Sequence, residues 1–78
     1  MNEINVNYTV EEVKRILDGI IDCNRAGGND KFFVFLNGVE VVFSSYTINR
    51  YRDLIFYDDR GFDICSIPIK DISILLFF

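Results

Sequence analysis

Aspartate is the residue type whose spacing in this sequence comes closest to a ligand set. Asp58, Asp59 and Asp63 surround one predicted turn, and carboxylates grouped in this way can hold a hard cation. Their spacing matches no EF-hand loop, and a charged cluster between two strands is typically a solvated turn. The sequence therefore predicts no metal site and no cofactor site.

Catalytic side chains are scarce, because none of the 78 residues is a histidine. Histidine is the commonest general base and the usual activator of a cysteine nucleophile. Cys23 and Cys65 are interpreted as buried thiols, not as a disulfide or a nucleophile. We expect a protein that is not an enzyme.

One segment, Asn49-Arg50-Tyr51-Arg52, combines basic and aromatic side chains. Arginine beside tyrosine can stack on nucleic-acid bases or anchor a protein interface. The alternative is a solvated loop in which Tyr51 folds back on the core. Because Asp53, Asp58, Asp59 and Asp63 follow closely and would repel phosphate, a protein partner fits this segment better than nucleic acid.

The overall charge leads to the same preference. The formal net charge is −4, whereas a nucleic-acid module normally carries a basic face. An acidic balance favours solubility or a basic partner. No apolar run has the length of a membrane span and no secretory signal is recognised, so we expect a soluble, cytoplasmic protein with no membrane partner.

The chain length allows a single domain, residues 1–78. Half of the residues are hydrophobic, which supports a rich core. A domain of this size still hides only about 60% of its unfolded surface, and such domains often need a partner subunit.

An amphipathic helix is predicted from Val10 to Arg25 or Ala26. Thr9 and Glu12 have capping-box spacing, and Gly27-Gly28 tolerate the backbone that ends a helix. One apolar stripe runs along it, at Val13, Ile16, Leu17, Ile20 and Ile21. Residues 4–8, before the helix, suit either a short edge strand or an extended lead-in.

A β-hairpin is predicted from Lys31–Leu36 and Val39–Ser44, because Asn37-Gly38 is typical of a type I′ turn. This turn pairs Leu36 with Val39. One face then carries Phe32, Val34, Leu36, Val39, Val41 and Phe43. The other carries Phe33, Phe35 and Val42 beside Glu40, so both faces are largely apolar, and one helix cannot cover both.

A second hairpin is predicted from Asp53–Tyr57 and Phe62–Ile67, with Gly61 supplying a positive φ in the turn. Ser44–Arg52, before it, is interpreted as a connection with a short strand. Pro68 ends the last strand of the hairpin, and Ile67–Ile72 forms a one-turn corner.

The final segment, Ser73–Phe78, is predicted as a strand without polar alternation, which is normally buried on both faces. Either it completes the monomer, or Leu75, Phe77 and Phe78 face another copy of the chain. We favour a homo-oligomer, because a single helix covers little of the sheet.

The predicted fold class is α+β, with an N-terminal amphipathic helix packed on a small, strongly curved antiparallel sheet of four to five strands. The order of elements over residues 10–77 resembles an SH3-like or Sm-like barrel. Its nearest local parallels are Phe35-Leu36-Asn37-Gly38 and Ile67-Pro68-Ile69-Lys70-Asp71-Ile72. The Sm-like resemblance implies a ring that binds RNA.

The leading functional hypothesis is a small acidic protein that acts by protein–protein contact. Asp58, Asp59 and Asp63 would approach a basic groove while Arg50, Tyr51 and Arg52 supply the anchor. In composition the chain is similar to phage-encoded inhibitors of host proteins, including anti-CRISPR proteins. The alternatives are an Sm-like nucleic-acid binder and a module that holds a small ligand at a subunit interface.

Overall fold

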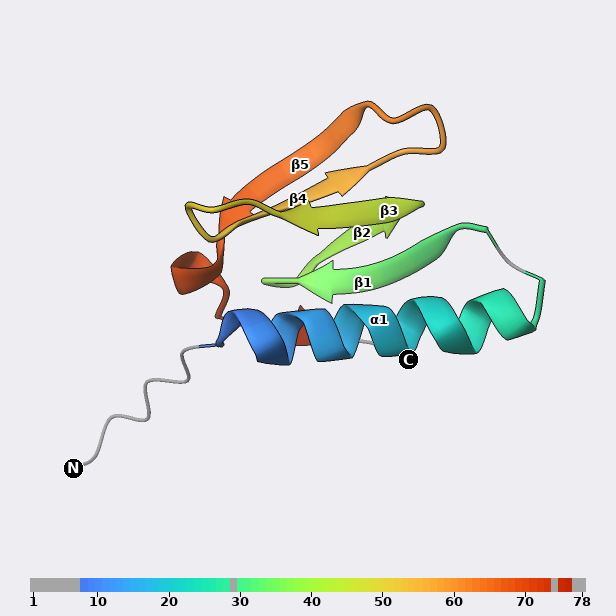
Figure 1. The fold of residues 1–78 in the computed structure, drawn as a ribbon, viewed down its shortest axis with the longest axis horizontal. Helices are drawn as coiled ribbons and strands as arrows, with labels where there is room; N and C mark the ends of the chain where they lie inside the picture. The colour runs from blue at the N-terminus through green and yellow to red at the C-terminus, as the bar shows by residue number, and fades with distance from the viewer. Residues whose placement is uncertain (1–7, 29, 74, 77–78) are drawn as a thin grey trace.

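The computed structural model describes residues 8–28, 30–73 and 75–76 (Figure 1). Within them the order of elements confirms the α+β class. The elements are α1 (Val10–Ala26), β1 (Phe32–Leu36), β2 (Val39–Phe43), β3 (Ser45–Ile48), β4 (Asp53–Tyr57), β5 (Asp63–Pro68), the 3-10 helix η1 (Ile69–Asp71) and β6 (Leu75–Leu76).

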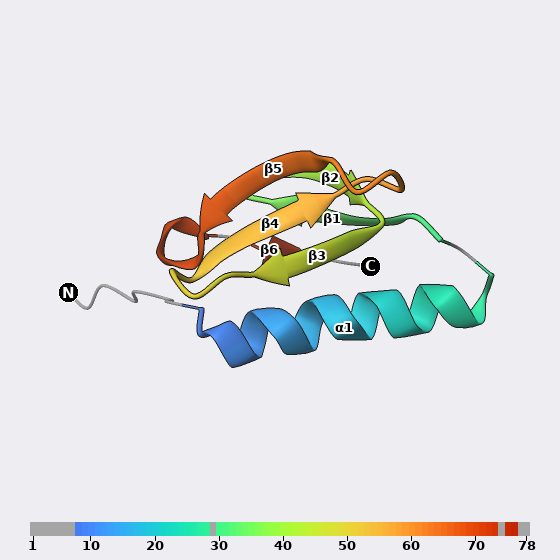
Figure 2. The same cartoon turned by 45° about the horizontal axis from the view of Figure 1, so that its top comes forward.

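Helix α1 begins at the predicted capping box. The Glu12 amide donates to the Thr9 hydroxyl at 3.1 Å, and the Thr9 amide donates to the Glu12 carboxylate at 3.2 Å. The apolar stripe is confirmed, since Val13, Leu17 and Ile20 are buried. The helix lies along one side of the molecule, with the strands on the other (Figure 2).

The first hairpin has the predicted register, with Leu36 opposite Val39 and Phe32 opposite Phe43. Positive φ values at Asn37 (51°) and Gly38 (83°) fit the type I′ turn. On the other side of β1, the short strand β6 pairs antiparallel with it.

The two faces of this hairpin are buried unequally. The core face is as predicted except at Val39, which is 64% exposed. Val39 lines a groove between β2 and β5, which do not pair with each other among the described residues. On the opposite face, Phe33 and Val42 are each about half exposed. The described residues therefore leave part of that face open.

The prediction of a single sheet of four to five strands needs correction, because the strands form two three-stranded sheets of order β2-β1-β6 and β3-β4-β5. The chain passes from one sheet to the other at Ser44. Beyond Phe43 it exchanges β1 for β4 as its partner, and the Ser44 amide donates to the Tyr57 carbonyl at 2.9 Å. The partner exchange at this bend is what divides the sheet.

The second sheet confirms both the short strand after Ser44 and the second hairpin (Figure 2). Strand β5 ends at Pro68, and η1 forms the predicted one-turn corner. A closed barrel is not confirmed: within the described residues, β2 pairs only with β1 and β5 only with β4.

The core joins the helix to both sheets in one cluster. Phe43 lies at its centre, with ring centroids 5.8 Å from Phe32 and 4.7 Å from Phe56. At the edge of this core, the Tyr46 hydroxyl of β3 donates to the Asp18 carboxylate of α1 at 2.6 Å. This hydrogen bond ties the helix to the second sheet.

Two terminal predictions fall mainly outside the described residues. Of the predicted strand Ser73–Phe78, the structure describes the β6 pair and Ser73, which precedes it without strand geometry. Of residues 4–8 it describes Tyr8, which packs against the core.

Candidate functional site

The turn between β4 and β5 is held by the side chain of its first residue. One carboxylate oxygen of Asp58 accepts from the amides of Arg60 and Phe62, each at 2.9 Å. Gly61 has φ 84°, as the sequence predicted, and its amide donates to the Asp58 carbonyl at 3.1 Å. These contacts fix a rigid tip, which we call the acidic tip (residues 58–63).

The acidic tip exposes the aromatic side chain of Phe62, which was predicted only as the first residue of a strand. Phe62 is 67% exposed, and the carboxylates of Asp59 and Asp63 beside it are also exposed. Arg60 in the same turn, and Lys31 across a shallow hollow from Asp59, partly offset this charge. Phe62 follows a glycine and precedes an aspartate. This isolation from other apolar residues is the sequence signal that could have predicted its exposure.

At the other end of β4, Asn49 holds a second turn in the same manner. Its side-chain oxygen accepts from the amides of Tyr51 at 2.9 Å and Asp53 at 3.0 Å. Arg52 has φ 64°, an uncommon backbone conformation for a residue with a side chain. We call residues 49–52 the basic turn.

Tyr51 does not fold back on the core, which was one of the two interpretations of this segment. Its side chain is 69% exposed, and the Arg50 guanidinium lies 5.0 Å from the centre of its ring. Arg50 also donates to the Tyr51 hydroxyl at 2.9 Å. The two side chains thus form one exposed, cationic and aromatic unit.

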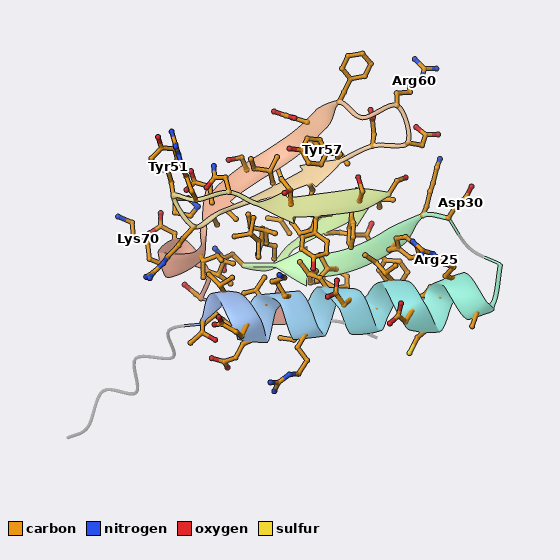
Figure 3. The ribbon with its side chains drawn as sticks, in the orientation of Figure 1. Arg25, Asp30, Tyr51, Tyr57, Arg60 and Lys70 are labelled. Atoms are coloured by element: carbon orange, nitrogen blue, oxygen red, sulfur yellow. The ribbon has the colours of Figure 1, made fainter. Side chains whose placement is uncertain are left out.

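The predicted site residues therefore belong to two separate groups. The acidic tip and the basic turn lie at opposite ends of β4, whose five residues span about 17 Å at strand geometry. Figure 3 shows Tyr51 and Arg60 at opposite ends of the sheet. A partner that contacts both groups has to cover the length of the β4–β5 hairpin.

A groove of ≈ 690 Å³ adjoins the basic turn, where the start of α1 meets η1. Tyr51, Arg52 and Lys70 line it together with the acidic Glu11 and Asp53. Its charge is therefore mixed, which suits a polar ligand with groups of both signs better than a bare anion.

The two cysteines differ in their surroundings. Cys65 lies in β5, half-buried, and burial raises the pKa of its thiol. Cys23 is exposed on the last turns of α1, so the prediction that it is buried is wrong. It lies beyond Ile20, which is the last buried residue of α1. Both thiols are free.

The predicted oligomer contacts are described only in part. Leu75 belongs to β6 and pairs with Leu36 through the backbone, whereas Phe77 and Phe78 lie outside the described residues.

Two features are absent from the described part of the chain. No group of three or more cysteine, aspartate or glutamate side chains there is placed to hold a metal ion. Likewise, none of its helices combines the length and the apolar character needed to cross a membrane.

Comparison with known proteins gives no relative: the chain matches no protein family, no curated protein and no solved structure at a significant level.

Proposed function

We propose that this chain is a non-enzymatic binding protein that covers part of a larger, basic protein in the cytoplasm. It would act as an inhibitor by occlusion, as small phage-encoded inhibitors of host proteins do. The acidic tip would make the first contact.

The observation that carries this proposal is the exposure of Phe62 on a rigid turn. An aromatic ring that is 67% exposed leaves apolar surface in water, and aromatic side chains are enriched among the residues that dominate binding energy. Because Asp58 already fixes the backbone around Phe62, binding loses little loop entropy.

Electrostatics would select the partner. Asp59 and Asp63 flank Phe62, so a complementary pocket is apolar at its centre and carries lysine or arginine at its rim. Such rim charges raise the association rate more than they raise affinity. The basic turn, with Arg50, Tyr51 and Arg52, would supply a second anchor for a partner that covers the whole hairpin.

Variants of the tip test this proposal in a quantitative pull-down with the immobilised chain, followed by measurement with the purified partner. Phe62→Ala and the double variant Asp59→Lys/Asp63→Lys should each weaken binding at least about tenfold. Asp58 is left in place, because its replacement would also disturb the turn.

The matched control is Asp22→Lys/Asp71→Lys, which changes the net charge equally at exposed positions away from the tip. It should bind like the unmodified chain. Binding that survives both tip variants would remove the tip as the site.

A second candidate function is nucleic-acid binding by an Sm-like assembly. The supporting observation is that Arg52 and Lys70 line one groove with the exposed Tyr51, to which Arg50 donates a hydrogen bond. Figure 3 shows Tyr51 and Lys70 at one end of the molecule. This function predicts a steep dependence of oligonucleotide affinity on salt, and its loss in Arg50→Ala/Arg52→Ala. No binding at low salt would exclude it.

The adjoining groove supports the third candidate, a small-ligand module. Its volume of ≈ 690 Å³ lies within the usual range for ligand sites. A rise in melting temperature with a nucleotide or metabolite, absent in Arg52→Ala, would support it.

Homo-oligomer formation remains part of the proposal, with Leu75, Phe77 and Phe78 at the contact. Phe33 and Val42 are half-exposed on the outer face of the first sheet. This apolar exposure supports an interface in which a second copy of the chain covers that face. Light scattering on the intact chain and on a chain ending at Ser73 tests this. We expect the intact chain to be an oligomer and the chain ending at Ser73 to be a folded monomer. An intact chain that is monomeric would contradict the proposal.

A further inference from the structure

We propose that the outer edge of β2 binds an extended peptide segment of another protein by strand addition, and that this segment is apolar and carries a lysine or arginine opposite Glu40. Its residues differ from those of the acidic tip, although Val42 lines one hollow with Asp58 and Asp59.

The backbone of β2 has the geometry for this addition. In a hairpin with a two-residue turn, Leu36 and Val39 form a hydrogen-bonded pair, so Val39, Val41 and Phe43 bond to β1. The peptide groups of Glu40 and Val42 then point away from β1. Ser44 continues the alternation, and its amide reaches the Tyr57 carbonyl instead of β1, as this geometry requires.

The bend at Ser44 leaves that edge without a paired strand in the part of the chain that the structure describes. Beyond the bend the chain pairs with β4, whereas β2 itself pairs with β1 alone among the described residues. An edge strand of this kind presents a row of backbone donors and acceptors to another chain. The edge lacks the proline and the lysine that commonly block such pairing, since β2 reads Val-Glu-Val-Val-Phe.

The edge of β5 is less suitable, which makes β2 the site. The Ile69 amide donates to Arg52 on the β4 side, so by alternation the outward peptide groups near it are those of Ser66 and Pro68. Proline has no amide to donate, and the β4–β5 ladder is irregular beside Phe56 and Tyr57. Strand β5 therefore forms a wall of the groove.

The groove between the two edges has a volume of ≈ 480 Å³ and is mainly apolar. Val39 and Val41 of β2 and Ile64 and Ile67 of β5 are among the residues that line it, and Ile64 is 42% exposed. Side chains at alternate positions of an added strand would enter this space. Apolar residues are required at those positions.

Charge defines the other positions. Within the described lining, Glu40 is the charged residue, and it lies on the outer face with Val42 and Phe33. The side chain directly opposite Glu40 on an added strand lies within reach of the carboxylate, where opposite charges stabilise and like charges destabilise. This selects lysine or arginine.

The probe for the test is the synthetic peptide acetyl-Val-Lys-Val-Thr-Val-Ser-amide, titrated into the isotope-labelled full chain. Binding should shift the amide resonances of Glu40 and Val42 and slow their hydrogen exchange. Glu40→Lys should weaken binding roughly threefold to tenfold, and a peptide with glutamate in place of lysine should recover a similar factor in that variant.

Two controls separate strand addition from general attraction. Asp22→Lys makes the same charge change on an exposed helix position and should leave the affinity unchanged. A peptide N-methylated at alternate residues loses the backbone donors and should bind at least about tenfold more weakly. Val42→Pro removes the outward amide of β2 and should have a similar effect. If circular dichroism shows that Val42→Pro is unfolded, the affinity of Glu40→Lys for the peptide decides the test.

Absence of shifts at Glu40 and Val42 with millimolar peptide would overturn the proposal. So would an equal effect of Asp22→Lys and Glu40→Lys. A chain that is dimeric through β2, and that becomes monomeric in Val42→Pro while ignoring the peptide, would assign the edge to a second copy instead.

Discussion

The two turns that flank β4 share one backbone design. Asn49 and Asp58 each use one side-chain oxygen to accept from the amides two and four residues later. The third residue after each has positive φ, 64° at Arg52 and 84° at Gly61. The same hydrogen bonds therefore build a basic turn at one end of the strand and an acidic tip at the other.

The difference between the turns lies in the residue with positive φ. Glycine adopts this backbone without steric cost, whereas a residue with a side chain loses about 1–2 kcal/mol. Arg52 is nevertheless held there, and its carbonyl accepts from the Ile69 amide at 2.9 Å. The backbone therefore sets the rigidity of both ends, while the side chains on it decide what each end can bind.

The largest expected effect on stability comes from a substitution in β4, the strand between the two turns. Phe56 is fully buried on β4, 4.7 Å from the Phe43 ring centre. Phe56→Ala should lower the free energy of unfolding by about 3–5 kcal/mol and loosen both turns together. Urea denaturation measures the loss. A loss below about 1 kcal/mol would contradict the position of Phe56 in the core.

The side-chain oxygen that holds each turn has the next largest effect. Asn49→Ala and Asp58→Ala should each lower the free energy of unfolding by about 1–2 kcal/mol, because two amides lose their acceptor. Asp58→Asn keeps an oxygen acceptor and serves as the control. Hydrogen exchange should accelerate at Tyr51 and Asp53 in the first variant, and at Arg60 and Phe62 in the second. Acceleration in the opposite turn would show that the turns are not independent.

Exchanging the residues with positive φ should move stability in opposite directions. Gly61→Ala meets no atom within 4 Å, so its cost of about 1 kcal/mol comes from the backbone alone. Arg52→Gly should raise the free energy of unfolding by about 0.5–1 kcal/mol, because it relieves the same strain. Thermal unfolding should show a lower melting temperature for Gly61→Ala and a higher one for Arg52→Gly. A destabilised Arg52→Gly would mean that the arginine side chain, not the backbone, dominates at this position.

The smallest effect on stability is expected from a substitution outside both turns. It shows whether the basic turn and the acidic tip respond to a loss of stability elsewhere in the molecule. Tyr46→Phe removes the hydrogen bond to Asp18 and should lower the free energy of unfolding by about 0.5–1 kcal/mol. Hydrogen exchange in the two turns should stay unchanged.

Tyr46 should also make the free energy of unfolding depend on pH in the alkaline range. Burial and the Asp18 carboxylate raise the pKa of Tyr46 above its usual value. The folded state therefore holds this proton more tightly than the unfolded chain. The stabilisation is complete below about pH 10 and declines as the pH rises above it. Urea denaturation between neutral and alkaline pH should show this decline in the unmodified chain and a smaller one in Tyr46→Phe.

Local signals explain the parts of the fold that the sequence predicts. A two-residue Asn37-Gly38 turn fixes the register of the first hairpin, and the Thr9–Glu12 capping box fixes the start of α1. Gly61 likewise marks the position of positive φ in the acidic tip. Each of these features depends on residues within a few positions of one another.

The remaining features depend on contacts distant in sequence. The division into two sheets follows from the partner exchange at Ser44, where the amide meets Tyr57. Val39 is exposed at the groove between β2 and β5, which do not pair among the described residues, and no local pattern encodes that separation. Five of the six predicted site residues lie in the two turns and Asp63 begins β5, but their separation by the length of β4 requires the topology of the sheet.

The measurement that tests the central claim most directly compares a photocrosslinking amino acid at Phe62 with the same amino acid at Tyr51. The two side chains are almost equally exposed, at 67% and 69%, so they differ in location and not in access. Our account predicts that Phe62 crosslinks to a protein partner in cells, in competition with the unmodified chain. Crosslinking from Tyr51 alone, or to nucleic acid, would contradict the assignment of the acidic tip as the binding surface.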